Sequence, residues 1–270
     1  MATLRYSGLL SNFDPLLSII LLGPQIRIMI TVNIDIGKRI EQAHHVQVPG
    51  FEFSFSQALQ ESSNRFRRDW ENLEPDLYMA DGGKYRLRRY GLYQLSASSG
   101  RLSHVPGATF YQSSKTNPLN GGTHRHFAPL AADTVNNPFL HELIRFDFAK
   151  LTSKNHIEDD WLVGVHQIRI VATTGVTANP TPEGTHRDDE TYTAQHLIAR
   201  HNISGGINYF YGSGIEPAKL PLAVWKQESY FDSYYFDRSQ WHSVSPITCS
   251  NGNGHRDVIL IDFVESSRLN

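Results

Sequence analysis

Two side chains that suit a metal ion stand two positions apart in the segment PTPEGTHRDDE, residues 180–190. Imidazole nitrogen and carboxylate oxygen together suit divalent iron, and a third imidazole would complete a facial triad with open coordination positions. His186 and Asp188 could supply two ligands, and the segment SQWHSVSPI places His242 on a predicted strand further along the chain. Taken alone, the His-x-Asp pair is more typical of a polar surface turn, because 13 histidines and 27 acidic residues produce such pairs by chance.

An arginine at the start of a later apolar strand strengthens the hypothesis of a binding site. Arg256 follows the turn segment SNGNGH and precedes DVILIDF, which is apolar on both faces, as in a strand buried inside a sandwich. The planar guanidinium group could bind a carboxylate through two parallel hydrogen bonds. We therefore expect Arg256 to lie at the mouth of a cavity.

Two helices are predicted from capping residues and apolar spacing. The first begins near Ser54, which forms a possible capping box with Gln57, and it ends before Pro75. Its apolar face consists of Leu59, Phe66, Trp70 and Leu73. The second begins at Asn137 with Pro138 in the first turn, and it buries Leu140, Leu143, Ile144, Phe148 and Leu151.

Short aromatic and β-branched runs, separated by Gly, Pro, Asn and Ser, predict strands in the remainder of the chain. They cover residues 84–95, 161–172, 205–212, 220–227, 233–244 and 257–264. Strands that follow helices, without βαβ alternation, favour a sandwich or barrel with helices packed outside. The sequence therefore predicts a mainly β fold with flanking helices.

The chain reads as one domain over residues 51–270, preceded by an N-terminal extension, residues 1–50, that we expect to be peripheral. The run LLSIILLG, residues 16–23, is preceded by Asp14 and ended by Pro24, and no small-residue cleavage pattern follows, so we do not expect a signal peptide. The run is also too short for a membrane span, which needs about 20 apolar residues.

Composition argues against several classes of partner. Lysine and arginine total 25 against 27 acidic residues, so no general field would attract nucleic acid or an anionic membrane. We therefore expect a small-molecule partner. The single cysteine, Cys249, excludes an internal disulfide and fits a cytoplasmic location. The sequence does not determine the oligomeric state.

Seven segments occur in an order that points to a known family. They are YRLRRYG (85–91), NPLNGGTHRHFAPL (117–130), VHQIRI (165–170), PTPEGTHRD (180–188), HNISGG (201–206), HSVSPI (242–247) and HRDVILIDF (255–263). Together they resemble the iron(II)- and 2-oxoglutarate-dependent dioxygenases, specifically the free amino-acid hydroxylases that include isoleucine hydroxylase. Seven motifs in order are far more specific than one His-x-Asp pair.

The resemblance implies a fold, a metal centre and a reaction. The fold is the double-stranded β-helix, a jelly-roll relative of the cupins, which agrees with the strand-rich pattern. Iron(II) is held by His186, Asp188 and His242, and Arg256 pairs with the distal carboxylate of 2-oxoglutarate. Oxygen is the other cosubstrate. A C–H bond of a free, aliphatic L-amino acid is hydroxylated while 2-oxoglutarate is converted to succinate and carbon dioxide.

A free amino acid needs a forked cation for its carboxylate, an acceptor for its ammonium group and an apolar pocket. Arg125 follows a glycine pair that permits a tight turn, and it is one candidate for the cation. From the crowded arginines of residues 86–89, one or two are expected to reach the substrate, with Arg89 as the candidate.

The predicted strand at residues 161–172 offers two more candidates. Alternation places Gln167 and Arg169 on one face of this strand, opposite His166 and Ile168. A solvated strand face is the competing interpretation of Gln167 and Arg169.

Some alternatives stay open. Oxidative cyclisation, such as aziridine formation, or desaturation of a similar amino acid in secondary metabolism would use the same ligands as hydroxylation. Relatives usually have glycine after the metal-binding aspartate, where this chain has Asp189 and then Glu190. A relative's exact substrate is therefore not transferable. A binding module on the same jelly roll is a different class, and it would not need Arg256.

Overall fold

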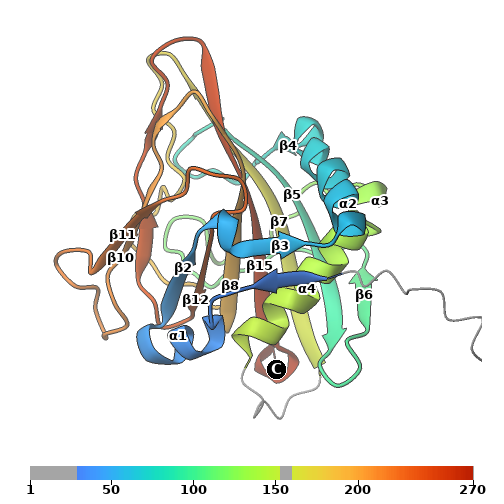
Figure 1. The fold of residues 1–270 in the computed structure, drawn as a ribbon. Helices are drawn as coiled ribbons and strands as arrows, with labels where there is room; N and C mark the ends of the chain where they lie inside the picture. Colours follow the sequence, from blue (N-terminus) through green and yellow to red (C-terminus); the bar gives the residue numbers. More distant parts are fainter. Residues whose placement is uncertain (1–28, 153–159, 270) are drawn as a thin grey trace, which may run out of the picture.

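The computed structural model describes residues 29–152 and 160–269. It shows two main antiparallel sheets, with helices packed against the larger one (Figure 1). The larger sheet runs in the order β2 (His45–Val48), β12 (Ser233–Asp237), β8 (Tyr192–His201), β15 (Asn253–Glu265), β7 (Asp160–Thr173), β5 (Arg86–Ser96) and β4 (Glu74–Pro75), with β6 (Leu102–Val105) beside β5. The smaller sheet runs β11 (Ala223–Lys226), β10 (Ile207–Phe210) and β13 (His242–Val244). Two further pairs are β1 (Ile30–Val32) with β3 (Phe53–Phe55) and β9 (Ser204–Gly205) with β14 (Ile247–Thr248).

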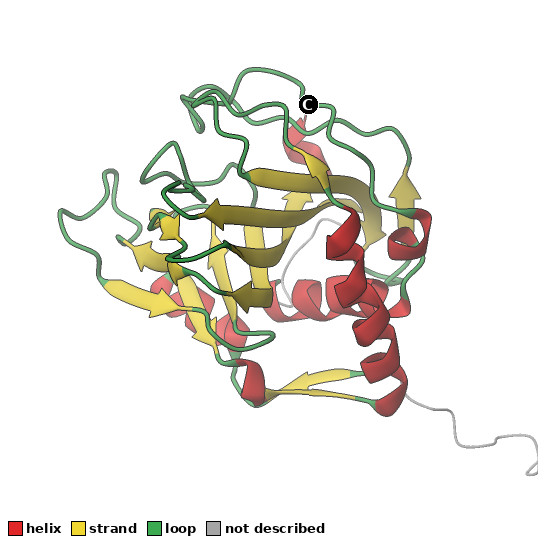
Figure 2. Cartoon of the chain, turned by 90° about the horizontal axis from the view of Figure 1, so that it is seen from above, coloured by secondary structure: helices red, strands yellow, loops and turns green. Residues whose placement is uncertain are grey.

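The longer helices lie together on one side of the larger sheet, as Figure 2 shows. They are α1 (Ile36–Ala43), α2 (Gln57–Arg67) and α4 (Pro138–Leu151), accompanied by the short α3 (Ala132–Val135). Single 3-10 turns form η1 (Gly50–Glu52), η2 (Arg68–Asn72) and η3 (Ser266–Leu269). The predicted mainly β architecture with flanking helices is confirmed.

The start of α4 agrees with its prediction, whereas the start of α2 differs. The Asn137 side chain accepts a hydrogen bond from the Phe139 amide at 2.9 Å, so it caps α4 directly before Pro138. Helix α2 begins at Gln57, with Ser56 and not Ser54 in the capping position. Ser54 is unavailable for capping because it belongs to β3, where it pairs with Thr31.

The main core lies between the helices and the larger sheet. Phe148 of α4 packs against Trp161 of β7 and Phe263 of β15, with ring centroids 5.2 Å and 5.8 Å apart. Trp161 and Phe263 are fully buried. Burying a large apolar side chain of this kind contributes about 1.5–3 kcal/mol relative to leaving it exposed. These contacts pack α4 against one face of the larger sheet.

Residues 29–50, which the sequence suggested were peripheral, are integrated into this fold. Strand β2 pairs with β12 and forms one edge of the larger sheet, while Ile36 and Ile40 of α1 join the main core. The apolar period of α1 and β2 was missed because these elements are only eight and four residues long. The run at residues 16–23 lies outside the described residues.

Each predicted strand is present, with β12 and β13 dividing the predicted run at residues 233–244. The central strand β8 was not predicted. Its sequence YTAQHLIARH mixes polar and apolar residues, yet Gln195 and His196 are buried. A strand with polar residues on buried faces lacks the alternation by which strands are recognised.

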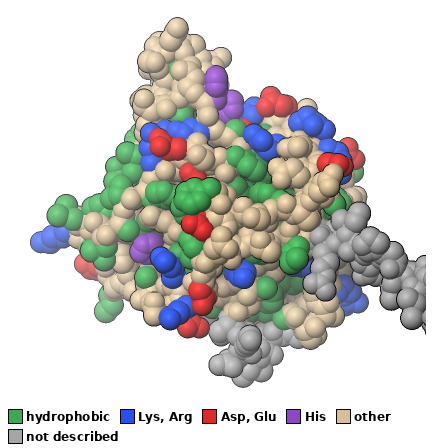
Figure 3. Space-filling model, viewed as in Figure 1, with side chains coloured by type: hydrophobic (Ala, Val, Ile, Leu, Met, Phe, Trp, Pro, Cys, Tyr) green, Lys and Arg blue, Asp and Glu red, His purple; other side chains and the backbone are tan. Residues whose placement is uncertain are grey.

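On the molecular face shown in Figure 3, basic and acidic side chains are interspersed, and neither sign dominates. None of the helices in the described part of the chain has both the length and the apolar character needed to cross a membrane.

Candidate active site

Side chains from both sheets and from two long loops, residues 106–131 and 174–191, enclose a cavity of about 120 Å³. Most of its polar lining is charged or carries an amide. These residues are Arg86, Arg88, Gln112, Asn117, Asn120, Arg125, His166, Glu183, His186, Asp188, Glu190, Gln195, His242, Arg256 and Asp262. Because so many charged groups meet in one small volume, the cavity is suited to a small, highly polar ligand.

Strand alternation decides which side chains reach the cavity. In β15, Arg256 and Asp262 face the cavity, whereas Ile259 and Phe263 belong to the helix-packed core. The register extends this row across the sheet, because Ile170 of β7 lies opposite both Arg256 and Arg86. Even-numbered residues of β5, β7 and β15 therefore form the cavity floor.

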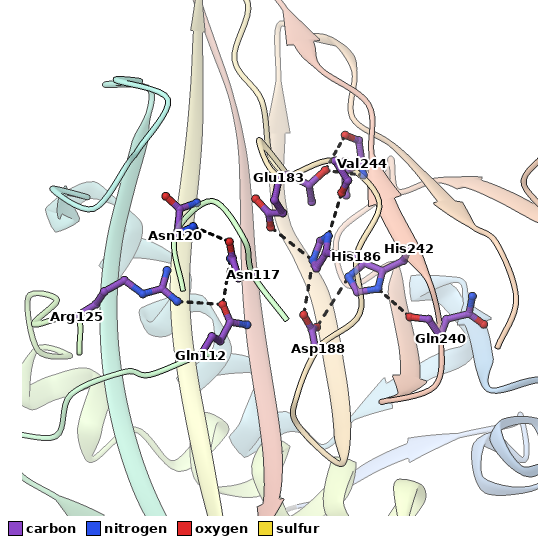
Figure 4. Close-up of polar contacts among 12 residues, drawn as sticks. Gln112, Asn117, Asn120, Arg125, Glu183, His186, Asp188, Gln240, His242 and Val244 are labelled. Carbon is purple, nitrogen blue, oxygen red and sulfur yellow. Dashed lines mark hydrogen bonds and ion pairs between the residues drawn. The ribbon is translucent and has the colours of Figure 1, made fainter. Parts of the chain in front are cut away.

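One histidine of the 174–191 loop and the first residue of β13 are held together by their backbones. His186 and His242 exchange two backbone hydrogen bonds of 3.0 Å and 2.9 Å. Asp188 approaches both rings, with carboxylate oxygens 3.6 Å from His186 Nε2 and 3.8 Å from His242 Nε2 (Figure 4). The three donor atoms lie within 4.8 Å of one another. They could therefore share one metal ion.

Backbone carbonyl groups orient both imidazole rings. His186 Nδ1 lies 3.0 Å from the Gly184 carbonyl oxygen, and His242 Nδ1 lies 3.3 Å from that of Gln240. Each carbonyl can only accept a hydrogen bond, so each Nδ1 carries the proton. The lone pair is then on Nε2, directed at the shared position, as metal-binding histidines require.

Burial favours the uncharged form of two donor groups, the imidazole of His242 and the carboxyl group of Asp188. It lowers the pKa of His242 well below the ordinary value, and the neighbouring His186 adds to this shift. Burial also raises the pKa of Asp188 to about 7, although His186 acts in the opposite direction. A bound cation favours the ionised carboxylate and needs neutral imidazole. Two neutral imidazoles and one carboxylate fit iron(II).

Arg256 lies in the cavity as expected, with 2% of its surface exposed. Its Nη2 donates a hydrogen bond of 2.6 Å to the Gln227 side-chain oxygen. The adjacent Asp257 faces the opposite side of the strand, where it pairs with Arg169 at 2.8 Å. Among the described residues, no carboxylate forms an ion pair with Arg256. A buried cation in this state favours binding of an anion.

Arg125 also lines the cavity. It is the one predicted substrate contact that the structure places there. Its Nη2 donates to Gln112 Oε1 at 2.9 Å, and Asn117 Nδ2 donates to the same oxygen at 3.2 Å (Figure 4). The loop turns at Gly122, which has a φ of +79°. The glycine pair therefore forms the tight turn that was predicted from the sequence.

Two aromatic rings hold Arg125 beside a second arginine. The Arg88 guanidinium carbon lies 4.1 Å from the Phe127 ring centroid, and that of Arg125 lies 4.7 Å from the Phe110 centroid. Such cation–π contacts stabilise each charge by about 0.5–2 kcal/mol. Burial, followed by the neighbouring Arg86, lowers the pKa of Arg88 to about 9, which still leaves it protonated at neutral pH.

Behind the arginines, a histidine connects a cation to a carboxylate. Arg88 Nη2 donates to His166 Nδ1, and His166 Nε2 lies 2.8 Å from Asp262 Oδ2. Burial and the nearby arginines keep the pKa of His166 well below its ordinary value, so the ring is neutral and accepts at Nδ1. Burial raises the pKa of the Asp262 carboxyl group to about 7.

The other three predicted substrate contacts do not line the cavity. Arg89 donates to the Asn72 and Pro129 carbonyl oxygens on the helix side of β5. Gln167 is fully buried, and Arg169 pairs with Asp257; both lie on the face of β7 opposite His166. The sequence separated the two faces of this strand correctly, but the face of His166, and not that of Gln167 and Arg169, lines the cavity.

His166 and Asp262 were therefore missed, and Arg89 was chosen from the arginine cluster in place of Arg88, although a usable signal was present. Asp262 is six positions from Arg256 in an extended strand, so it must share the face that Arg256 presents to the cavity. The same rule applied from Arg88 excludes Arg89, because adjacent strand residues face opposite sides. The pairing of β7 with β15, which adds His166, requires the tertiary structure.

Asp189 connects the metal-binding loop to the loop that carries Arg125. Its carboxylate accepts a hydrogen bond of 3.2 Å from the Ser113 amide and another from the Thr116 hydroxyl. The Thr116 amide is bonded in turn to Ser113 Oγ at 3.1 Å. Asp189 therefore faces away from the metal donors, and it fixes the loop over the cavity.

Comparisons with known proteins agree with this geometry. A family model described as 2OG-Fe dioxygenase matches residues 67–262. An L-isoleucine-4-hydroxylase of Bacillus thuringiensis is 29% identical over 234 residues, which are 83% of this chain and 94% of the relative.

Solved structures show the same fold. The crystal structure of IDO from Bacillus thuringiensis covers 85% of this chain and 93% of its own, with a TM-score of 0.70 and 21% identity. A BsmA homologue from Methylobium petroleophilum gives a TM-score of 0.70 at 26% identity, covering 85% of this chain and 91% of its own. The predicted jelly-roll fold is thereby confirmed.

The Asp189 contacts lead to a prediction about the loop. Asp189→Ala should increase amide hydrogen exchange at residues 113–117, because the Ser113 amide and Thr116 hydroxyl lose their acceptor. Iron content should stay at the wild-type level. Lys115→Ala, in the same loop, serves as the control and should exchange like wild type. Unchanged exchange in Asp189→Ala would show that other contacts hold the loop.

Proposed function

Because this chain belongs to the 2OG-Fe dioxygenase family, we propose that it hydroxylates a free aliphatic L-amino acid with iron(II), 2-oxoglutarate and oxygen. The observation that supports this most directly is the arrangement of His186, Asp188 and His242 at the wall of a cavity that also contains unpaired arginines. The family implies the metal and both cosubstrates. The amino-acid substrate is suggested by the similarity to an isoleucine hydroxylase.

The proposed metal ligands are His186, Asp188 and His242. When bound there, iron would supply the chemistry that couples oxygen reduction and 2-oxoglutarate decarboxylation to oxidation of a C–H bond. The chain itself holds both Nε2 lone pairs in place through the backbone carbonyl groups of Gly184 and Gln240. It also excludes water, since the metal-binding side chains are only about one-tenth exposed.

Arg256 is the proposed partner of the distal 2-oxoglutarate carboxylate. Gln227 fixes one side of its guanidinium group, and Asp257 is engaged by Arg169 on the other face of the sheet. The Nε atom of Arg256 has no hydrogen-bond partner among the described residues, which leaves a donor for a dicarboxylate. A desolvated arginine–carboxylate pair gives both affinity and orientation.

Arg125 is the proposed partner of the amino-acid carboxylate, with Arg88 beside it. Both guanidinium groups are buried among Phe110 and Phe127, and neither forms an ion pair with a carboxylate in the described part of the chain. The apolar groups Ile168, Val258 and Leu260 also line the cavity and would receive an aliphatic side chain.

Among the described residues, no contact specifically favours cyclisation or desaturation over hydroxylation.

We propose a cytoplasmic location, which is supported by Cys249 being buried and in no disulfide.

The function is tested by measuring succinate after iron-loaded protein is incubated with 2-oxoglutarate and each common amino acid in turn. We expect a large rise with one or a few aliphatic amino acids, and a gain of one oxygen atom in the product by mass spectrometry. Asp188→Ala should lose both bound iron and turnover, because the facial triad loses its carboxylate. Glu190→Ala should keep its iron. Equal iron content in wild type and Asp188→Ala would disprove the ligand assignment.

The Arg256 assignment predicts weaker cosubstrate binding in two variants. Arg256→Ala should weaken 2-oxoglutarate binding by about 2–5 kcal/mol, because a desolvated carboxylate is left without its partner. Arg256→Lys keeps the charge but loses the planar fork, and its loss of affinity should be smaller. An anaerobic titration of the iron–2-oxoglutarate charge-transfer absorption measures both. Wild-type titration of Arg256→Ala would show that this arginine is purely structural.

The two substrate arginines predicted from sequence should now behave differently. Arg125→Ala should weaken amino-acid binding by about 2–5 kcal/mol while iron and 2-oxoglutarate still bind. Arg169→Ala should leave amino-acid affinity unchanged but reduce the free energy of unfolding by about 3–5 kcal/mol, because it strands the buried Asp257. Calorimetric titration and urea denaturation separate the two effects. Full affinity in Arg125→Ala would move the carboxylate contact to Arg86 or Arg88.

A further inference from the structure

A buried carboxyl group without a side-chain partner lies in the same cavity as the arginines that form no ion pair. Glu190 is 7% exposed, and its Oε2 has no hydrogen-bond partner among the described residues. It lines the cavity that Arg88 and Arg125 also line. Those arginines are 7% and 2% exposed, and each has an Nε atom without a partner. The cavity therefore holds a carboxyl oxygen and guanidinium donors that lack partners among the described residues.

The other carboxylates of the cavity already have a neighbour. Asp262 lies 2.8 Å from His166, and it also bonds to Thr193. Glu183 is 3.5 Å from His186 Nε2, on the metal side of the cavity. Asp188 approaches both metal-binding histidines. Among these side chains, Glu190 alone has neither a hydrogen bond nor an ion pair to another described side chain.

We propose that Glu190 accepts the α-ammonium group of the substrate amino acid while Arg88 and Arg125 bind its carboxylate. This assignment rests on the function proposed above and deepens it. A zwitterion carries its two charges on neighbouring groups, so it can satisfy a carboxylate and an arginine pair in one small cavity. A buried charge is stable only with an opposite partner, and the ligand supplies both partners at once.

The assignment defines the class of substrate. A 2-hydroxy acid satisfies the arginines but leaves Glu190 without a cation. An N-acylated or peptide-linked residue also lacks the ammonium group, and it adds volume to a cavity of about 120 Å³. The cavity therefore selects the free amino acid, because a site built to pair a polar group strongly rejects analogues that lack it.

The test compares ligands that differ only in the ammonium group. L-isoleucine, L-leucine and L-valine are each compared with their α-hydroxy analogues by calorimetric titration of iron(II)- and 2-oxoglutarate-bound protein without oxygen. Wild type should bind the preferred amino acid at least about 30-fold more tightly than its hydroxy analogue. Glu190→Gln should abolish this preference by weakening the binding of the amino acid, while the affinity for the hydroxy analogue stays within about threefold of wild type.

Two further variants test whether the preference for the amino acid depends on the charge at residue 190, on the shape of that side chain, or on its position in the cavity. Glu190→Asp keeps the charge, so it should retain a clear preference for the amino acid. Glu74→Gln removes an exposed carboxylate that pairs with Arg89 outside the cavity, and it should behave like wild type. Iron and 2-oxoglutarate binding, read from the charge-transfer absorption, verifies that each variant is folded and loaded.

Several results would overturn the assignment. If Glu190→Gln weakens the binding of the amino acid and of the hydroxy analogue equally, Glu190 shapes the cavity but does not recognise the ammonium group. If Asp262→Asn abolishes the preference and Glu190→Gln does not, the ammonium group binds at Asp262. If no aliphatic amino acid binds to wild type, the proposed function itself fails and the Glu190 assignment fails with it. Binding with unaltered discrimination in Glu190→Gln refutes only the assignment.

Discussion

The alternation of side chains along β15 is the constraint on which the rest of the site depends. This strand pairs with β7 along one edge and with β8 along the other, so it lies inside the larger sheet. One face supplies Ile259 and Phe263 to the helix-packed core, and the other supplies Arg256 and Asp262 to the cavity. A register slip of one residue would exchange these sets and bury charge in the core. Packing of the core therefore also positions the charged groups of the cavity.

A second constraint on the site is that many charged groups lie together in a small, partly dehydrated volume. Aromatic rings support Arg88 and Arg125, while a neutral histidine separates Arg88 from Asp262. The fold can hold these groups because the larger sheet is stabilised on its other face by the helices. Several of their polar atoms have no hydrogen-bond partner among the described residues, so this capacity is available to a ligand.

The predictions from sequence succeeded where the signal was local. The cap at Asn137 located the start of α4, and alternating or continuous apolar runs located β5, β7 and β15. They failed where tertiary contacts override local pattern. Strand β8 places polar residues on covered faces, and α1 and β2 are too short for their period to stand out. Those elements are stabilised mainly by packing and pairing with distant segments.

The sequence by itself determined the types of chemical group available: two histidines and an aspartate suited to iron, an arginine at the head of a buried strand, and alternating faces on each strand. It could not determine which face of β7 lines the cavity. That choice depends on which side the helices cover, and α4 packs against the face of Trp161, leaving the face of His166 to the cavity. Likewise, only the tertiary structure brings His186 beside His242. Their backbones pair although the two residues lie far apart along the chain, and no local sequence pattern indicates such a pairing.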